Sequence, residues 1–347
     1  MKKPSMVISA VCAVAFVVLI ILKPGLCTGG AAEGILLSGR VIIPSLFPFT
    51  ACVLFIMKSG ALDIFKFAAP FTKKVFGLSP ELFSLMLLSF IGGYPIGAKL
   101  LNEAVKLRRI SPENAGIMLN YCVNAGPAFV ILAVGGGIIG SKAIGYILLA
   151  AHIVSSFILS LVFGRFIKGE EAKKEEQAYK STADNFVTCV SEAASAVFSI
   201  CAYVIFFSTI ISYINFYSEK LPFIKYLSQL LEVTNAVSKT RNILIIAFLL
   251  GFSGFCIWCQ IISVGERLKI NYPIFAASRI AHGLLSVGIT ALLLKIFNIP
   301  LTVSAAVRFA PSYSTLSLSV SMLCMVIVLL ITLYTKNRTG KILDDIV

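Results

Sequence analysis

The chain is a succession of long apolar stretches separated by short polar segments. About eight of these stretches reach the roughly 17–25 residues that a helix needs to cross the hydrocarbon core of a bilayer. They lie near Met6–Leu22, Glu81–Val105, Ile117–Ile139, Ala143–Phe166, Phe186–Phe216, Ile243–Val264, Ile274–Phe297 and Leu316–Tyr334. The pattern predicts an all-α polytopic membrane protein, with about eight to ten membrane segments when re-entrant segments are included.

One further apolar stretch, Ala31–Met57, contains Pro44 and Pro48. Proline removes a backbone donor and disturbs a helix interior. Two interpretations are open at this point: a broken ninth span or a re-entrant hairpin.

Two polar interruptions of apolar stretches resemble each other. Gly93–Lys99 aligns without a gap with Gly254–Gln260, and the same offset places Pro112 on Pro273. Matched broken helices in the two halves of a membrane protein indicate a substrate site at the interface of an internal repeat. We therefore predict two structural repeats with broken helices.

A second kind of interruption follows in each half, at Asn120–Pro127 and at Arg279–Gly283. Lipid cannot satisfy the backbone groups that such interruptions free, so the backbone there must be buried in protein or line a wet cavity. Both segments are therefore expected to break their spans close to a binding site.

A highly charged segment between the two halves marks the main seam of the chain. The expected organisation is an N-terminal signal-anchor span (1–30), a first repeat (31–167), a charged linker (168–184), a second repeat (185–335) and a short polar tail (336–347). The first stretch follows Lys2 and Lys3 but is longer than the apolar region of about 7–15 residues in a cleaved signal, which favours an uncleaved anchor.

Composition excludes a water-soluble globular protein, since 58% of residues are hydrophobic and 13% charged. The net charge of +14 comes from clusters between the apolar stretches, such as Lys106–Arg109 and Arg267–Lys269. Such clusters set membrane topology, and no nucleic-acid partner is predicted. The charges favour parallel halves with both termini in the cytoplasm, while hairpins at Ala31–Met57 and at its partner in the second half would make the halves inverted.

Ionisable side chains within apolar stretches are functional candidates because they are costly when unpaired. Lys99 and Glu103 lie one helical turn apart, so they form either part of a site or a local ion pair. Arg279 and His282 share a helix face, and they form either an anion-binding arginine beside a titratable imidazole or an arginine that reaches toward the headgroups. His152 stands alone and is expected to be a core histidine.

The segment Leu231–Ala236 is a short polar segment that follows an apolar stretch. As a re-entrant tip, it offers Glu232, Thr234 and Asn235 to a coupling ion. As an interfacial loop, it begins the next helix, with Thr234 or Asn235 as the cap.

These patterns give a predicted set of substrate-binding residues and leave little support for an enzyme. The predicted set is Gly93, Tyr94, Pro95, Lys99, Glu103, Asn120, Asn124, Ser253, Gly254, Gln260, Arg279 and His282. No catalytic constellation, metal site or cofactor is predicted, and the oligomeric state is left open. The lipid bilayer and a small-molecule solute are the expected partners.

Several motifs also resemble a known family. Ile43–Phe49, Gly92–Lys99, Leu231–Asn235 and Gly251–Phe255 with Gln260 are similar to segments of the sporulation integral membrane proteins of the YlbJ type. That family belongs to the nucleoside-recognition or Gate domain superfamily, and the resemblance covers nearly the whole chain.

The resemblance implies a transporter in the cell membrane of a spore-forming bacterium, in the membrane around the forespore. It implies transport of a small anionic solute, with dipicolinate as the leading candidate. The alternatives are a nucleoside or metal-ion permease and a non-transporting scaffold protein of the developing spore membrane.

Overall fold

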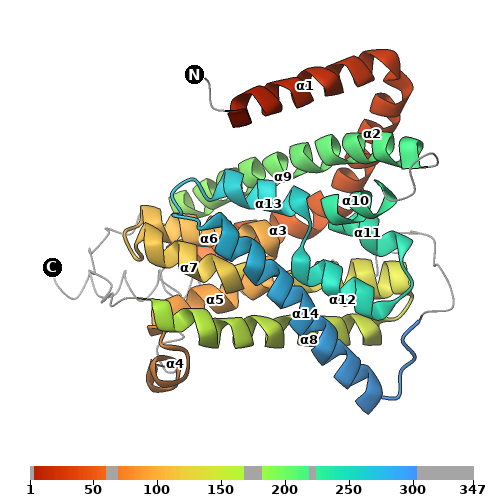
Figure 1. The fold of residues 1–347 in the computed structure, drawn as a ribbon. Helices are drawn as coiled ribbons and strands as arrows, with labels where there is room; N and C mark the ends of the chain where they lie inside the picture. Colours follow the sequence, from red (N-terminus) through yellow and green to blue (C-terminus); the bar gives the residue numbers. More distant parts are fainter. Residues whose placement is uncertain (1–3, 60–68, 168–181, 219–223, 303–347) are drawn as a thin grey trace.

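The computed structural model describes residues 4–59, 69–167, 182–218 and 224–302, and in these ranges the chain is helical apart from turns and one isolated bridge between Asn242 and Thr302 (Figure 1). The first part contains α1 Pro4–Leu22, α2 Pro24–Leu37, the π-helical η1 Ser38–Ile42, α3 Ile43–Lys58, α4 Ala69–Phe76, α5 Pro80–Gly92, α6 Tyr94–Lys106, α7 Pro112–Cys122, the π-helical η3 Ala128–Ile139, α8 Lys142–Phe163 and the 3₁₀ turn η4 Gly164–Phe166. The second part contains α9 Thr182–Ser218, α10 Ile224–Leu231, α11 Val233–Lys239, α12 Ile243–Phe252, α13 Phe255–Val264 and α14 Tyr272–Ile296.

Four described helical segments are long and apolar enough to cross a membrane, namely Lys142–Phe166, Asn185–Ser218, Ile243–Val264 and Tyr272–Ile296. A fifth results if Ala10–Leu22 and Pro24–Arg40 form one span, which is bent by 101° at the break between them. These helices are compatible with membrane insertion. The expected stretch Leu316–Tyr334, the polar tail and most of the charged linker lie outside the described residues.

The stretch expected near Glu81–Val105 forms two short helices that turn back on each other. Gly93 separates α5 from α6 with a φ of 94°, and Arg109 pairs with Glu81 at 3.4 Å, so the two open ends meet. Each helix has 13 residues and is about 20 Å long, shorter than the hydrocarbon core of about 30 Å. The α5–α6 hairpin thus divides a stretch of spanning length into two helices that are each too short to cross a bilayer.

A second helical hairpin, α10–α11, turns at Glu232. Lys239, at its end, donates to the Asn215 side chain near the end of α9 at 3.4 Å. The α5–α6 hairpin instead meets α9 near its beginning, where Lys106 pairs with Glu192 at 3.9 Å. Because about 35 Å of helix separates residues 192 and 215, the two hairpins enter the molecule from opposite ends.

Residues 24–58 are helical throughout and pack antiparallel along α9 (Figure 1). Tyr213 donates to the Lys23 carbonyl at 2.8 Å at one end of this contact, and Lys58 pairs with Glu192 at 2.6 Å at the other. The hairpin considered for Ala31–Met57 is therefore wrong. The π-helical η1 precedes Pro44, and Pro48 lies within α3 without ending it.

Two basic clusters that are far apart in the sequence lie together. The amide of Arg267 donates to the Asn102 side chain at 2.9 Å, and that of Lys269 donates to the Pro112 carbonyl at 3.0 Å. The two clusters therefore share one end of the helices, as the charge-based topology requires.

We expect the glycines of α2 to set its distance from α9. A Cβ at Gly34 would lie 2.5 Å from the Ile205 Cα, whereas one at Gly29 would meet nothing within 4 Å. Gly34→Ala should destabilise the protein by about 1–3 kcal/mol through overpacking. Gly29→Ala should leave stability unchanged or slightly raise it, and thermal unfolding of both variants in the same detergent provides the comparison. Equal stability of the two variants would contradict this packing.

Candidate functional site

Four interruptions of helices lie in two pairs inside the molecule. At the first pair, a Cβ built on Gly93 would lie 3.4 Å from the Gly126 amide nitrogen, within the non-helical residues 123–126 between α7 and η3. At the second, a Cβ on Gly254 would lie 3.3 Å from the Leu230 and Leu231 carbonyl oxygens. Each hairpin tip thus rests against a break in a neighbouring helix.

The breaks expected at Gly93 and Gly254 are confirmed. Gly254 has a φ of 82°, and Ser253 precedes it with a φ of 70°. Both glycines therefore occupy the left-handed region that favours a residue without a Cβ. Pro95 lies in the first turn of α6, where the missing amide costs no hydrogen bond.

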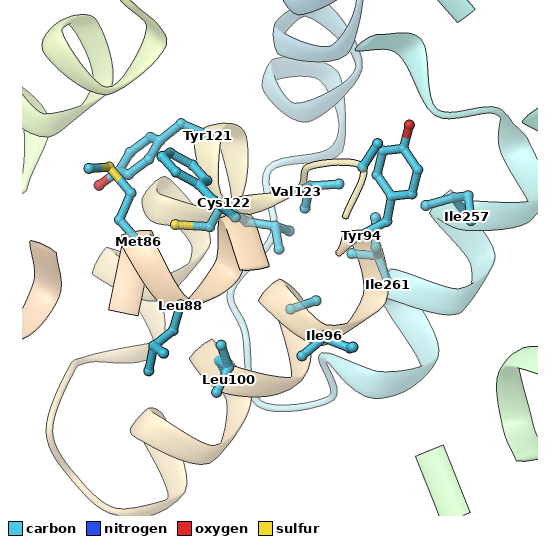
Figure 2. Packing of buried hydrophobic residues seen from close by; sticks show 14 of the residues in the cluster. Met86, Leu88, Tyr94, Ile96, Leu100, Tyr121, Cys122, Val123, Ile257 and Ile261 are labelled. Atoms are coloured by element: carbon cyan, nitrogen blue, oxygen red, sulfur yellow. The ribbon is translucent and has the colours of Figure 1, made fainter. Parts of the chain in front are cut away.

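Tyr94 joins the two pairs of interruptions. Its hydroxyl donates to the Leu250 carbonyl at 2.6 Å, a carbonyl that would accept from the Gly254 amide in an unbroken helix. Figure 2 shows Tyr94 between Val123 of the first pair and Ile257 of α13. A side chain of the first hairpin therefore satisfies backbone freed by the break in α12–α13.

Arg279 is fully buried and holds the broken end of α7. Its guanidinium donates to the Val123 carbonyl at 2.6 Å and to the Asn120 carbonyl. The interpretation in which Arg279 reaches out to the headgroups is therefore wrong. The expected interruption at Arg279–Gly283 is wrong as well, because α14 continues through it and Gly283 provides room for Phe248 at close contact.

Two histidines complete the arrangement. His152 Nε2 accepts from the Ala125 amide at 2.8 Å, so the neutral ring carries its proton on Nδ1. His282 Nε2 lies 3.1 Å from the His152 carbonyl, and the two rings stack with centroids 4.3 Å apart. His152 was expected only in the core. Its isolated position in the sequence gave no sign that it supports the break at Ala125.

The two asparagines of this segment differ in role. Asn124 donates to the Tyr121 carbonyl at 2.9 Å and accepts from Ser156, so both its nitrogen and its oxygen are engaged at the break. Asn120 donates to the Ile117 carbonyl at 2.9 Å, and its Oδ1 is buried without a partner among the described residues.

We call Tyr94, Asn120, His152, Arg279 and His282 the central cluster. It contains four buried polar atoms without a hydrogen-bond partner among the described residues, namely Asn120 Oδ1, His152 Nδ1, Arg279 Nε and His282 Nδ1. Buried polar groups are almost always satisfied by protein, ordered water or ligand. Within the described part of the chain no carboxylate pairs with Arg279. The cluster is therefore a positively charged site with donors and acceptors available to a bound molecule.

Lys99 and Glu103 lie in a separate ion-pair network. Lys99 pairs with Glu103 at 3.5 Å, and Glu103 also pairs with Lys106 at 3.3 Å. Lys106 continues the network to Glu192, which pairs with Lys58. The local pair expected from their spacing is confirmed, and Lys99 shares the buried Glu103 carboxylate with Lys106.

The predicted ion-coupling residues lie at the tip of α10–α11. The Glu232 carboxylate accepts from the Thr234 amide at 3.0 Å and from the Asn235 amide at 2.7 Å. Glu232 is thus the cap of α11, and the expectation that Thr234 or Asn235 would cap it is wrong, because the capping side chain must immediately precede the first helical residue.

The remaining predicted residues of the second half lie at the break between α12 and α13 or within α13. Ser253 donates to the Phe252 carbonyl, and Gln260 donates to Cys256 Sγ at 3.3 Å. Gln260 Oε1 is buried without a partner among the described residues. The structure therefore separates the predicted set into the central cluster, the Lys99 network and the Glu232 tip.

Comparisons with protein-family models, curated proteins and solved structures find no match to this chain.

The Tyr94 hydroxyl is expected to stabilise the contact between the two pairs of interruptions. Tyr94→Phe removes one buried hydrogen bond and leaves the Leu250 carbonyl without its donor, so it should lower stability by about 1–3 kcal/mol. Tyr146→Phe is the matched control, because Tyr146 is 59% exposed on α8. Thermal unfolding should separate the two variants, and a Tyr94→Phe variant as stable as its control would contradict the role assigned to this hydroxyl.

Proposed function

We propose that the protein is an integral membrane transporter for a small anionic solute, which binds at the central cluster. The observation that carries the proposal is a buried arginine that holds the break after α7 and that no described carboxylate neutralises, with the second pair of interruptions joined to the first through Tyr94. Broken helices at membrane depth are the usual means by which transporters present backbone groups to a substrate.

The order of elements supports a transporter with two inverted halves. A hairpin, an interrupted helix and a long helix follow one another as α5–α6, α7–η3 and α8, and again as α10–α11, α12–α13 and α14. The hairpins enter from opposite ends. In this proposal the halves are inverted and not parallel as the charges favoured. The repeat pairs Gly93 with Glu232 at the hairpin tips, and not with Gly254 as in the sequence alignment, and it pairs the break at residues 123–126 with that at Gly254.

Charge supports an anion as the solute. The Arg279 charge is buried and has no described carboxylate partner, whereas Lys99 pairs with the buried Glu103 carboxylate. The positive end of α6, a helix of 13 residues, also begins at the first pair of interruptions. An anion bound there would gain from both, and would offer acceptors to Arg279 Nε and His152 Nδ1.

The resemblance to the YlbJ-type family adds the identity of the solute to this proposal. Dipicolinate is a small planar dicarboxylate, so its charge suits Arg279 and its ring suits the stacked imidazoles of His152 and His282. The corresponding location is the bacterial cell membrane, and during spore formation the membrane around the forespore.

Uptake into proteoliposomes tests the proposal. The wild type should accumulate labelled dipicolinate saturably and not uridine. Arg279→Lys keeps a charge but loses the planar fork of donors, so uptake should fall at least about tenfold, as loss of a charged hydrogen bond implies. Lys269→Ala removes an exposed cation and should transport as the wild type does.

A second variant separates loss of function from loss of folding. His282→Gln keeps a donor for the His152 carbonyl and should also reduce uptake, with size-exclusion profiles confirming that each variant remains folded. Saturable uridine uptake would favour the nucleoside permease. No uptake of either solute by well-inserted wild type would favour a scaffold and overturn the proposal.

A further inference from the structure

The tip of the α10–α11 hairpin gathers oxygen atoms around a buried negative charge. In an unbroken helix the Leu230 and Leu231 carbonyls would accept from the amides of Thr234 and Asn235. Both amides donate instead to the Glu232 carboxylate. The two carbonyls therefore lose their helical donors at the same place where a carboxylate is buried.

No described cationic side chain balances this charge. Glu232 is 3% exposed and forms hydrogen bonds only at the hairpin tip. The negative end of α10 disfavours this charge, whereas the two α11 amides that Glu232 accepts from stabilise it. A buried carboxylate beside a carbonyl-lined helix end is costly unless a cation or proton accompanies it.

The neighbouring break in α12–α13 approaches these carbonyls closely. A Cβ on Gly254 would lie 3.3 Å from each of the Leu230 and Leu231 carbonyl oxygens and 3.3 Å from the Val233 amide nitrogen, so the close approach requires glycine. Cys256, the second residue of α13, is buried in the same small apolar cluster as Leu231. Gln260 donates its amide nitrogen to Cys256 and retains a buried Oε1 without a described partner.

We infer that the two facing breaks form a binding site for a monovalent alkali cation, held by the Glu232 carboxylate and the Leu230 and Leu231 carbonyls, with Gln260 as the nearby amide oxygen. Carboxylate and carbonyl oxygens are the ligands that hard cations prefer. One carboxylate facing the positive end of α13 provides too little negative charge for a dehydrated divalent ion. The role of this cation as a coupling ion rests on the proposed function. Its binding can be measured without the solute.

Trp258 provides a direct signal for the test. It is the only tryptophan in the chain, and its indole donates across the break to the Phe252 carbonyl at 3.1 Å. Tryptophan fluorescence of the full chain in nanodiscs is titrated with NaCl and with KCl against N-methylglucamine chloride at constant ionic strength. We expect a saturable change with Na⁺ or K⁺ and none with N-methylglucamine.

Three variants locate the site. Glu232→Gln should weaken the apparent cation affinity at least tenfold while retaining an acceptor for the α11 amides. Gln260→Leu leaves the hairpin tip unchanged and should weaken the apparent cation affinity severalfold. This variant therefore tests the site if Glu232→Gln does not fold. Glu113→Gln removes an exposed carboxylate paired with Lys269 and should titrate as the wild type does.

The outcomes separate this inference from the proposed function. No saturable response of the wild type to either cation, or equal responses of the wild type and Gln260→Leu, would overturn the cation site. A response to pH alone would assign the position to a proton and overturn it too. Cation binding without uptake of dipicolinate would contradict the transport proposal and leave the cation site supported.

Discussion

The structure depends on one constraint, which is that every break in a helix at membrane depth frees backbone groups that lipid cannot satisfy. At several of the described breaks a side chain from elsewhere in the chain satisfies these groups. Arg279 of α14 takes the freed carbonyls of α7, and His152 of α8 takes the Ala125 amide. Tyr94 of the first hairpin takes the freed carbonyl of α12.

These satisfied breaks tie the two parts of the chain together. Arg279 lies 156 positions beyond Val123 in the sequence, and Leu250 lies 156 beyond Tyr94. Residues that stabilise the breaks are therefore the residues that line the central cluster. A molecule that binds there would compete for the same donors, which gives binding a direct route to moving one part against the other.

The two breaks differ in electrostatic character. At the first, a buried guanidinium faces carbonyls and two neutral imidazoles. At the second, a buried carboxylate faces carbonyls. Tyr94 connects them through a single hydrogen bond. An anion at one and a cation at the other would each reduce the cost of the charge buried beside it, and this is the physical basis for coupling the two in the proposed transport.

Much of the fold followed from the sequence because glycine and proline within apolar stretches report backbone breaks directly. Gly93, Gly254 and the Asn120–Pro127 segment were located correctly for this reason. Long-range contacts could not be read in the same way. The spacing of Arg279 and Gly283 suggested a break, yet their neighbours in space, Val123 and Phe248, let α14 continue.

The hairpins were also only partly accessible to sequence reasoning. Glu81–Val105 has the length and hydropathy of a span, and only the ion pair between Glu81 and Arg109 shows that the stretch returns to the end at which it entered. His152 carried no local signal at all, because its role depends on an amide 27 positions earlier in the chain.

A cryo-electron microscopy map of the protein in lipid nanodiscs with dipicolinate tests the central claim most directly. The account predicts density for the solute beside Arg279 Nε and His152 Nδ1, between the tip of α5–α6 and the break at residues 123–126. Solute density elsewhere, or a map at saturating dipicolinate in which protein side chains alone fill the space around Arg279, would contradict it.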